Sequence, residues 1–319
     1  MGILNDADRK LTEIYREFLP KKVFDAHMHL YLSDAIPRFA GNGVFTLEKA
    51  TPNDYNDVMQ ELLPGVEEIR LNMLPFPDPA LNDLTSGLRD TANDHIVNQI
   101  RLNPQHIGAA YVLPTDSEDK IGEMLSQIGI CCLKPYYFTS PNGVVSTVEE
   151  FLPENIWAAA NVFQAPIILH MMRKNLADEA NFSYIDRMTK KYPNAPVVLA
   201  HCARGFAGWT AVKYIPKLAD RDNIWFDLSA ICETGPMMAA ILKTAGKRTM
   251  WGSDWPVCVN RGRAISLGDD QHWILGDPNH AYVATESLFA FYQTALLLSL
   301  DATQVEDIFY HNACKLFLN

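Results

Sequence analysis

Two histidines near the N-terminus have the spacing of a metal-chelating pair. His27 and His29 lie in VFDAHMHL, an otherwise largely apolar run of the kind that forms a buried strand. Residues two apart on a strand point to the same face, so both imidazoles are expected on one side. Neutral imidazole is a good ligand for zinc and other borderline divalent ions. The spacing determines the shared face and leaves open whether the pair binds a metal.

Further metal-capable side chains end other apolar runs. His170 ends APIILH, His201 ends APVVLAH and Asp254 ends RTMWGSD. Taken singly, each residue could be a hydrogen-bonded core histidine or a capping aspartate. Three histidines and one carboxylate around an ion leave a position for water, which is the arrangement of a catalytic site rather than a closed structural one. Because metal-capable residues end several of the predicted strands, the sequence favours a mononuclear catalytic metal site.

The order of the predicted elements indicates an α/β fold. Short apolar runs, each followed by a turn and a stretch with helical spacing, predict strands over 23–30, 66–74, 107–113, 130–136, 166–170, 196–201, 224–228 and 248–254. Helices are predicted over 117–128, 181–191, 236–245, 282–300 and 302–318. Eight strands alternating with helices favour a closed (β/α)8 TIM barrel, whose active site lies at the C-terminal ends of the strands. Neither GxGxxG nor the P-loop pattern occurs, which weakens a nucleotide-binding alternative.

Composition limits the partners and the domain organisation. The 319 residues contain no long Pro/Gly/Ser linker, so we expect one domain over 1–319. The net charge of -11, with both signs interspersed, argues against nucleic acid and anionic membranes and leaves a small molecule as the expected partner. No apolar run approaches the roughly 20 residues of a membrane span, and we expect a cytoplasmic protein. The six cysteines form no CxxC pair and are expected to be reduced. The composition is compatible with a homo-oligomer as well as with a monomer.

The ordered motifs of the chain resemble the amidohydrolase superfamily, and within it the branch often called amidohydrolase 2. These motifs are DAHMH at 25–29, LKPY at 133–136, ILH at 168–170, LAHCARG at 199–205, WGSDWP at 251–256 and HNACKLF at 311–317. The resemblance implies that His27, His29, His170 and Asp254 are metal ligands and that His201 is catalytic. It also implies one divalent ion, zinc by preference and manganese as the alternative.

A lysine near the end of the fourth predicted strand, Lys134, allows two interpretations. In binuclear members of the superfamily a lysine on this strand is carbamylated and bridges two metals. Lys134 could instead remain an ammonium group that contacts substrate or a neighbouring carboxylate, which fits the mononuclear branch better. Where the family often has Lys-x-His, this chain has Lys134, Pro135 and Tyr136, so no role is assigned to that histidine.

Other residues at strand ends are candidates for binding substrate. Arg173 and Arg204 each follow a site histidine by three residues, in HMMR and HCAR, where they could bind a carboxylate in bidentate fashion. The alternative for both is an ordinary salt bridge. Tyr136, Glu233 and Trp255 could shape the pocket, although Trp255 could equally pack beneath Asp254.

The segment over 31–64 is longer than an ordinary βα loop and is predicted to form a partial lid, with Arg38 as a further candidate for substrate contact. The preferred function is hydrolysis of a small carboxylated or polyhydroxylated molecule, a lactone above all, by a metal-activated water. In that mechanism Asp254 orients the water or takes its proton, and His201 polarises the carbonyl or handles a proton. The alternatives are a non-oxidative decarboxylase of an aromatic or enol acid, and a non-catalytic metal-binding barrel.

Overall fold

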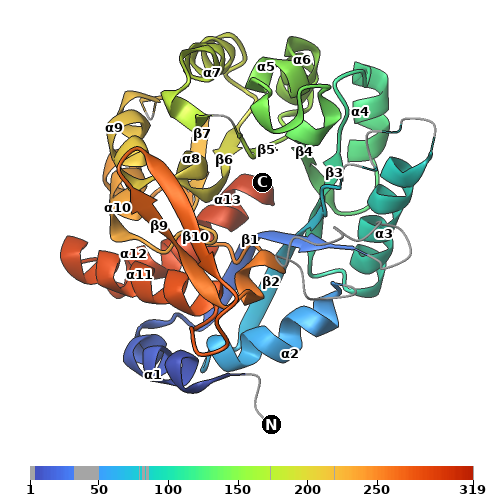
Figure 1. The fold of residues 1–319 in the computed structure, drawn as a ribbon. Helices are drawn as coiled ribbons and strands as arrows, with labels where there is room; N and C mark the ends of the chain where they lie inside the picture. The colour runs from blue at the N-terminus through green and yellow to red at the C-terminus, as the bar shows by residue number, and fades with distance from the viewer. Residues whose placement is uncertain are drawn as a thin grey trace.

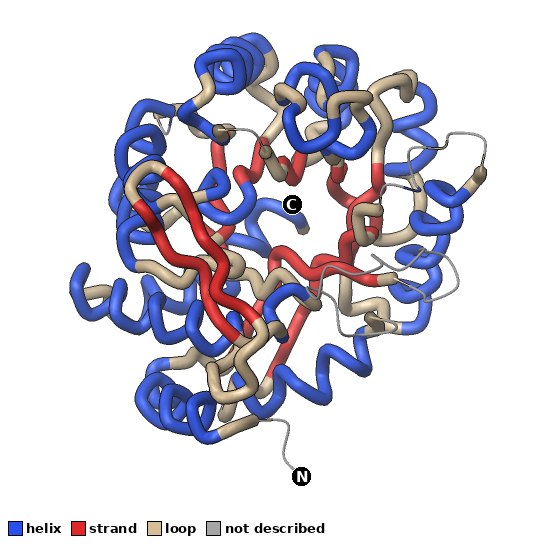
Figure 2. The backbone as a smooth tube through the Cα atoms, viewed as in Figure 1, coloured by secondary structure: helices blue, strands red, loops and turns tan. Residues whose placement is uncertain are grey.

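The protein forms a ring of eight parallel strands, each paired with its neighbour in chain order from β1 to β8. The computed structural model describes residues 4–31, 50–78, 80, 83, 86–172, 174–218 and 220–318. Figure 1 and Figure 2 show the strands around a centre, with helices packed on the outside. The strands are β1 (Lys22–Leu30), β2 (Glu68–Pro75), β3 (Ile107–Tyr111), β4 (Ile130–Lys134), β5 (Ile167–Leu169), β6 (Val197–Leu199), β7 (Ile224–Asp227) and β8 (Thr249–Met250).

The ring closes between β1 and the segment that follows β8. Ala26 N donates to Trp251 O at 3.1 Å, and Asp254 N donates to His27 O at 2.8 Å. His29 N also donates to the carbonyl of Trp255, at 2.7 Å. Because these bonds tie the carboxyl end of β1 to residues 251–255, the first and last candidate ligands of the sequence are brought side by side. The (β/α)8 barrel predicted from the sequence is confirmed.

Helices connect the strands and surround them. They are α1 (Asp6–Tyr15), α2 (Pro52–Leu62), α3 (Leu88–Leu102), α4 (Glu118–Leu125), α5 (Val148–Phe151), α6 (Glu154–Phe163), α7 (Glu179–Lys191), α9 (Gly208–Leu218), α10 (Thr234–Thr244), α11 (Val283–Leu298), α12 (Ala302–Glu306) and α13 (Asn312–Phe317). Side chains cap several of their N-termini, with Asn5, Thr51, Ser117 and Asp178 accepting from backbone N–H groups of the first turn. These caps define the starts of α1, α2, α4 and α7.

Two apolar clusters form the core. One fills the ring itself and includes Phe24, Ile168, Val198 and Met250, all of them buried. Phe317 of α13 belongs to this cluster, and its ring centroid lies 6.1 Å from that of Phe24. The other cluster packs the outer faces of the strands against the helices. The C-terminal helix therefore covers one end of the ring (Figure 1), which leaves the opposite end, where the strands terminate, for the site.

The pattern of apolar runs did not predict the antiparallel hairpin that follows β8. It consists of β9 (Gly262–Leu267) and β10 (Asp270–Leu275), which pair directly across the turn at Gly268 and Asp269. The turn residues between two runs containing β-branched and aromatic residues are an available hairpin signal. In Figure 1 the hairpin crosses in front of the strands at one side of the ring. The hairpin therefore lies beside the barrel strands as an additional element, outside the eight predicted strands.

The segment predicted as a lid is described only in part. Residues 32–49, and with them Arg38, lie outside the described residues. Tyr31 and Ala50 flank this stretch and form an antiparallel bridge, and residues 52–62 form α2 of the outer ring. Among the described helices, none is long and apolar enough to cross a membrane. All six cysteines are unpaired thiols.

Candidate metal centre and active-site cavity

The histidines and the aspartate singled out in the sequence lie at the C-terminal ends of the strands. His27 and His29 belong to β1, whereas His170 follows β5 and His201 follows β6. Asp254 lies in the segment that closes the ring after β8. The β1–β2 register shifts between Asp25 and Met28, beside the His-x-His pair, and such irregularities re-aim side chains at functional sites.

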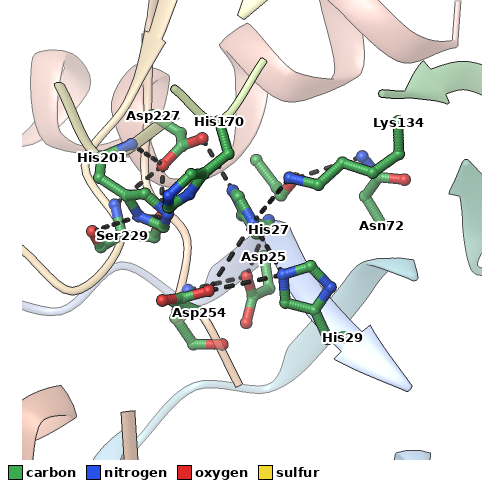
Figure 3. A network of polar contacts seen from close by, with 12 residues as sticks. Asp25, His27, His29, Asn72, Lys134, His170, His201, Asp227, Ser229 and Asp254 are labelled. Atoms are coloured by element: carbon green, nitrogen blue, oxygen red, sulfur yellow. Dashed lines mark hydrogen bonds and ion pairs between the residues drawn. The ribbon is translucent and has the colours of Figure 1, made fainter. Parts of the chain in front are cut away.

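Three side chains converge on one point (Figure 3). The Nε2 atoms of His27 and His29 lie 3.2 Å apart. Asp254 Oδ1 lies 3.7 Å from His27 Nε2 and 3.6 Å from His29 Nε2. Zn–N bonds of about 2.0–2.1 Å in a tetrahedral site separate neighbouring ligand atoms by about 3.3 Å. The three ligand atoms therefore have the separations that a tetrahedral divalent ion requires.

The tautomers of the two histidines support the same conclusion. His29 Nδ1 lies 3.2 Å from the carbonyl oxygen of Pro75, which can only accept, so Nδ1 carries the proton. His27 Nδ1 lies 3.0 Å from Asp227 Oδ2 and donates to that carboxylate. Each neutral ring then presents an unprotonated Nε2, and two buried lone pairs face each other beside a carboxylate. A cation between them resolves this arrangement, so the residues present fit a divalent metal.

Burial dominates the electrostatics of the site. It lowers the pKa of His27 and His29, which keeps both rings neutral and able to bind a metal. Burial also raises the pKa of Asp254 well above its ordinary value, although the charge of Lys134 opposes that shift. Burial lowers the pKa of Lys134 to about 8, against the attraction of Asp227 and Asp254. The Nζ of Lys134 lies 3.4 Å from His27 Nε2, on the side opposite Asp227 (Figure 3).

A buried network holds His201 and His170. His201 Nδ1 lies 3.1 Å from Ser229 O and 2.8 Å from Ser229 Oγ, and the Ser229 hydroxyl in turn donates to Asp227 Oδ1. His201 Nε2 lies 3.1 Å from His170 Nδ1. Burial lowers the pKa of His201 to about 3, so its imidazole is neutral. Sequence reasoning missed Asp227 and Ser229, although a carboxylate ending the apolar run IWFD was an available signal.

A second group of metal-capable side chains consists of His27, His201 and Asp227. The carboxylate of Asp227 already accepts hydrogen bonds from His27 Nδ1, the backbone N of His201 and the backbone N of Ser229. Neither His27 nor Asp227 lines the cavity described below. We therefore assign Asp227 as a hydrogen-bond acceptor and the group of His27, His29 and Asp254 as the candidate metal centre.

The backbone after β6, labelled α8 (Ala200–Arg204) in Figure 1, makes a left-handed turn. His201, Cys202, Ala203 and Arg204 have φ values of 54°, 50°, 59° and 58°. For residues with a Cβ this conformation costs roughly 1–2 kcal/mol each, and such strain gathers at functional sites. The hydrogen bond of 3.0 Å from His201 N to Asp227 Oδ1 and the bond from Gly205 N to His201 O hold the turn. Asp254 is also left-handed, with a φ of 59°.

A cavity of about 350 Å³ opens beside the candidate metal centre. Its metal-capable lining residues are His29, His170, His201 and Asp254. Its aromatic lining residues are Phe76, Tyr136, Tyr137, Phe138, Phe206 and Trp273. The hairpin contributes Gln271, Trp273 and Leu275, so β10 forms one wall. The cavity is therefore a largely aromatic pocket with the polar groups gathered where the strands end.

Among the described residues, Arg204 is the only arginine or lysine that lines this cavity. Within the described part of the chain no carboxylate forms an ion pair with it, and its Nε is buried without a hydrogen-bond partner. Gln271 Oε1 is likewise buried without a partner there. The carboxylate of Asp270 attracts the guanidinium of Arg204 without forming an ion pair with it. A partly buried cation with no direct contact to a described carboxylate suits an anionic ligand, because burying an uncompensated charge is costly.

The remaining candidates lie at different places. Tyr136 lines the cavity, and its ring centroid is 5.2 Å from that of His170. Lys134 is fully buried behind His27 and does not line the cavity, so its role in binding substrate stays a prediction. Trp255 is buried and packs edge-on against Tyr55, with 5.6 Å between ring centroids. Glu233 does not line the cavity either; it accepts from Ser266 N at 2.8 Å and so anchors the hairpin.

Two predicted roles are not decided by these contacts. Arg173 lies outside the described residues. His170 lines the cavity. In the described chain its ring nitrogens do not belong to either cluster of metal-capable side chains, in which all ligand atoms lie within 4.8 Å of one another. Its place as a metal ligand stays a prediction, and its ring lies next to that of His201, with 5.0 Å between centroids.

Comparison with known proteins places this site in a family. An amidohydrolase of Burkholderia multivorans with bound HEPES is similar in structure over 93% of this chain and 99% of its own, with a TM-score of 0.64 and 12% identity. A probable 2-pyrone-4,6-dicarboxylic acid hydrolase of Acinetobacter baumannii with citric acid bound matches 93% of this chain and 99% of its own, with a TM-score of 0.61 and 16% identity. A 2,6-dihydroxybenzoate decarboxylase complexed with 2,6-dihydroxybenzoate covers 94% and 100%, with a TM-score of 0.58 and 14% identity.

At these identities the structural matches show the shared fold. No curated protein matches the sequence. The model of the family Amidohydro_2, described as amidohydrolase, matches residues 24–318, which includes every candidate ligand from His27 to Asp254. The chain therefore belongs to the amidohydrolase family.

Proposed function

We propose that the protein is a metal-dependent hydrolase that opens a small carboxylated lactone with a planar ring. The observation that carries the proposal is the position of Asp254. Its Oδ1 lies within 3.7 Å of both histidine Nε2 atoms, while the same residue lines the aromatic cavity together with His201 and Arg204. A carboxylate between a metal site and a substrate cavity can act on both water and substrate.

The chain supplies the groups for hydrolysis. A divalent ion held by His27, His29 and Asp254, with His170 as the predicted fourth ligand, would lower the pKa of water. Asp254 faces the two histidines through Oδ1, which leaves Oδ2 to orient the attacking water and take its proton. Water adds to the lactone carbonyl carbon, the ring C–O bond breaks, and the proton passes to the departing oxygen.

The cavity favours a flat acid as substrate. Six aromatic side chains line it, and aromatic walls select planar rings. Arg204 provides a partly buried cation for a carboxylate on the ring. The similarity to a probable 2-pyrone-4,6-dicarboxylic acid hydrolase, whose name describes a cyclic ester with two carboxyl groups, supports this substrate class.

The second candidate is non-oxidative decarboxylation of an aromatic acid. The same aromatic walls and Arg204 suit a hydroxybenzoate, and a 2,6-dihydroxybenzoate decarboxylase is among the similar structures. In that reaction the carbon–carboxylate bond breaks, carbon dioxide leaves with the carboxyl carbon, and a proton from His201 or Asp254 takes its place on the ring. Zinc is the preferred metal, with manganese as the alternative because a similar decarboxylase from Polaromonas holds manganese.

One screen separates these reactions. The purified protein is analysed for metal, then incubated with carboxylated lactones and with aromatic acids while proton release and carbon dioxide are followed separately. We expect proton release without carbon dioxide. Carbon dioxide from an aromatic acid would select the decarboxylase. No turnover of either class by fully metal-loaded protein would contradict both and favour the non-catalytic barrel. The Asp254→Asn variant serves as the inactive control in each assay.

A further inference from the structure

Asp227 uses both of its carboxylate oxygens inside the barrel. It is the last residue of β7 and is 1% exposed. Its Oδ2 lies 3.0 Å from His27 Nδ1. Its Oδ1 accepts from His201 N at 3.0 Å, from Ser229 N at 3.1 Å and from the Ser229 hydroxyl. One buried side chain thus contacts the candidate metal ligand His27 through Oδ2. Through Oδ1 it contacts the backbone of His201 and the hydroxyl of Ser229 (Figure 3).

We infer that Asp227 is a positioning residue that keeps the proton of His27 on Nδ1 and, by receiving the proton of the Ser229 hydroxyl, supports the Nδ1 proton of His201. It thereby leaves the Nε2 atom of His27 free for a metal and the Nε2 atom of His201 unprotonated, where it accepts from His170 Nδ1. The inference rests on the proposed function only for the roles of the two histidines, which are metal binding for His27 and catalysis for His201.

The hydrogen bonds to Oδ1 decide the direction of the network. The two backbone N–H groups can only donate, so Oδ1 must accept from them. The Ser229 hydroxyl has a single proton and donates it to the same oxygen, so Ser229 Oγ can only accept from His201 Nδ1. Ser229 O is also an acceptor for Nδ1, at 3.1 Å. His201 therefore carries its proton on Nδ1.

The hydrogen bond to Asp227 also determines which nitrogen of His27 carries the proton. A carboxylate that receives this many donors is ionised and holds no proton of its own, so Oδ2 accepts and His27 Nδ1 donates. Hydrogen bonds of this kind fix the orientation and tautomer of metal-binding histidines, and their loss typically costs 10- to 100-fold in metal affinity or activity.

An Asp227→Asn substitution should reverse the tautomer of His27 alone. The two backbone N–H groups require an oxygen at the Oδ1 position, so the amide nitrogen must take the place of Oδ2. That nitrogen donates to His27 Nδ1 and drives the proton of the ring to Nε2, the atom that faces His29 and Asp254. The Ser229→Ala variant is the matched control, because it removes a hydroxyl of the same network without touching the contact between Asp227 and His27.

The test combines a spectroscopic readout with metal binding. Chelator-treated wild-type, Asp227→Asn and Ser229→Ala proteins are labelled with ¹⁵N-histidine, and His27→Gln assigns the His27 resonances. We expect Nδ1–H in the wild type and in Ser229→Ala, and Nε2–H in Asp227→Asn. Zinc affinity by chelator competition should fall about 10- to 100-fold in Asp227→Asn and stay near wild type in Ser229→Ala.

Three results would overturn the inference. They are an Nε2–H tautomer of His27 in the wild type, an unchanged tautomer and zinc affinity in Asp227→Asn, or an equal loss of zinc affinity in Ser229→Ala. If Asp227→Asn did not fold, the wild-type and Ser229→Ala spectra would still decide between the tautomers. A wild-type protein that binds no zinc would count against the proposed function, while the tautomers would still test the role of Asp227.

Discussion

His170 donates its Nδ1 proton to His201, whose Nε2 lies 3.1 Å away. His201 can only accept there, because its own proton is held on Nδ1 by Ser229. The direction of this bond leaves His170 Nε2 as the unprotonated nitrogen of its ring. His170 lines the cavity, so it retains a lone pair for the metal ligation predicted from the sequence.

Removing a ligand histidine should therefore remove metal and activity together. We expect His27→Ala and His170→Ala each to lower metal occupancy and turnover in parallel, because an open site with one ligand fewer chelates more weakly. Metal analysis, turnover and circular dichroism on one preparation provide the check. His311→Ala, at an exposed histidine, is the control and should behave as wild type. Wild-type metal content in His170→Ala would exclude that residue as a ligand.

The purified protein should carry about one divalent metal per chain, because one group of ligands surrounds one point beside the cavity. Metal analysis against protein concentration tests this stoichiometry. Two tightly bound ions at full occupancy would contradict it. That result would favour the carbamylated form of Lys134, whose Nζ lies 3.4 Å from His27 Nε2, and intact-protein mass spectrometry would then reveal the added carboxyl group.

The His201→Asn variant should keep its metal and lose turnover by roughly 100-fold or more, the scale for a positioned acid or base. His201 touches the cavity but is not part of the group formed by His27, His29 and Asp254. The competing interpretation is a structural histidine, since its ring also stacks on Phe206 with 5.3 Å between centroids. Near-normal turnover combined with a large fall in melting temperature would support that interpretation and leave Asp254 as the proton-transfer group.

Replacing the cavity arginine should weaken binding of acids selectively. For Arg204→Met we expect KM for a carboxylated substrate to rise about 10- to 100-fold, the loss of one charge-assisted hydrogen-bonded contact. KM for the methyl ester of the same substrate should change little. Lys213→Met alters a cation in the adjoining cavity and is the control, with an expected change of less than about fivefold. Equal losses for acid and ester would show that Arg204 acts only on the shape of the cavity.

The N-terminal helix should stabilise the base of the hairpin through Asp8. This fully buried carboxylate accepts from Arg261 Nη1, Tyr282 N and Thr285 Oγ1, each at 2.7 Å. We expect Asp8→Ala to lower the free energy of unfolding by about 3–5 kcal/mol, because it removes the buried carboxylate of the ion pair with Arg261. Urea unfolding measures the change. Asp6→Ala, on the exposed side of the same helix, should leave the unfolding midpoint unchanged.

Much of the barrel and the identity of its polar strand ends followed from local sequence patterns. Alternation and apolar runs predicted the β strands, with boundaries within a few residues at β1, β3 and β7. His27 and His29 were expected on one face because side chains two apart on a strand share a face. Asp254 was expected near them because parallel strands of one barrel end at the same rim. The strands and the shared face of His27 and His29 follow from the spacing of neighbouring residues alone, whereas the place of Asp254 also needs the predicted barrel.

The hydrogen-bond partners of these residues depended on contacts between distant parts of the chain. Asp227 and His27 are separated by 200 positions, and only the closed ring brings them within 3.0 Å. The hairpin β9–β10 reaches back over the mouth, so Gln271 and Trp273 meet Phe206 and His201 in one cavity. Arg204, the last residue of the left-handed turn, lines the same cavity. Local patterns determined which residues could act, whereas ring closure decided which of them share protons, ligands and substrate.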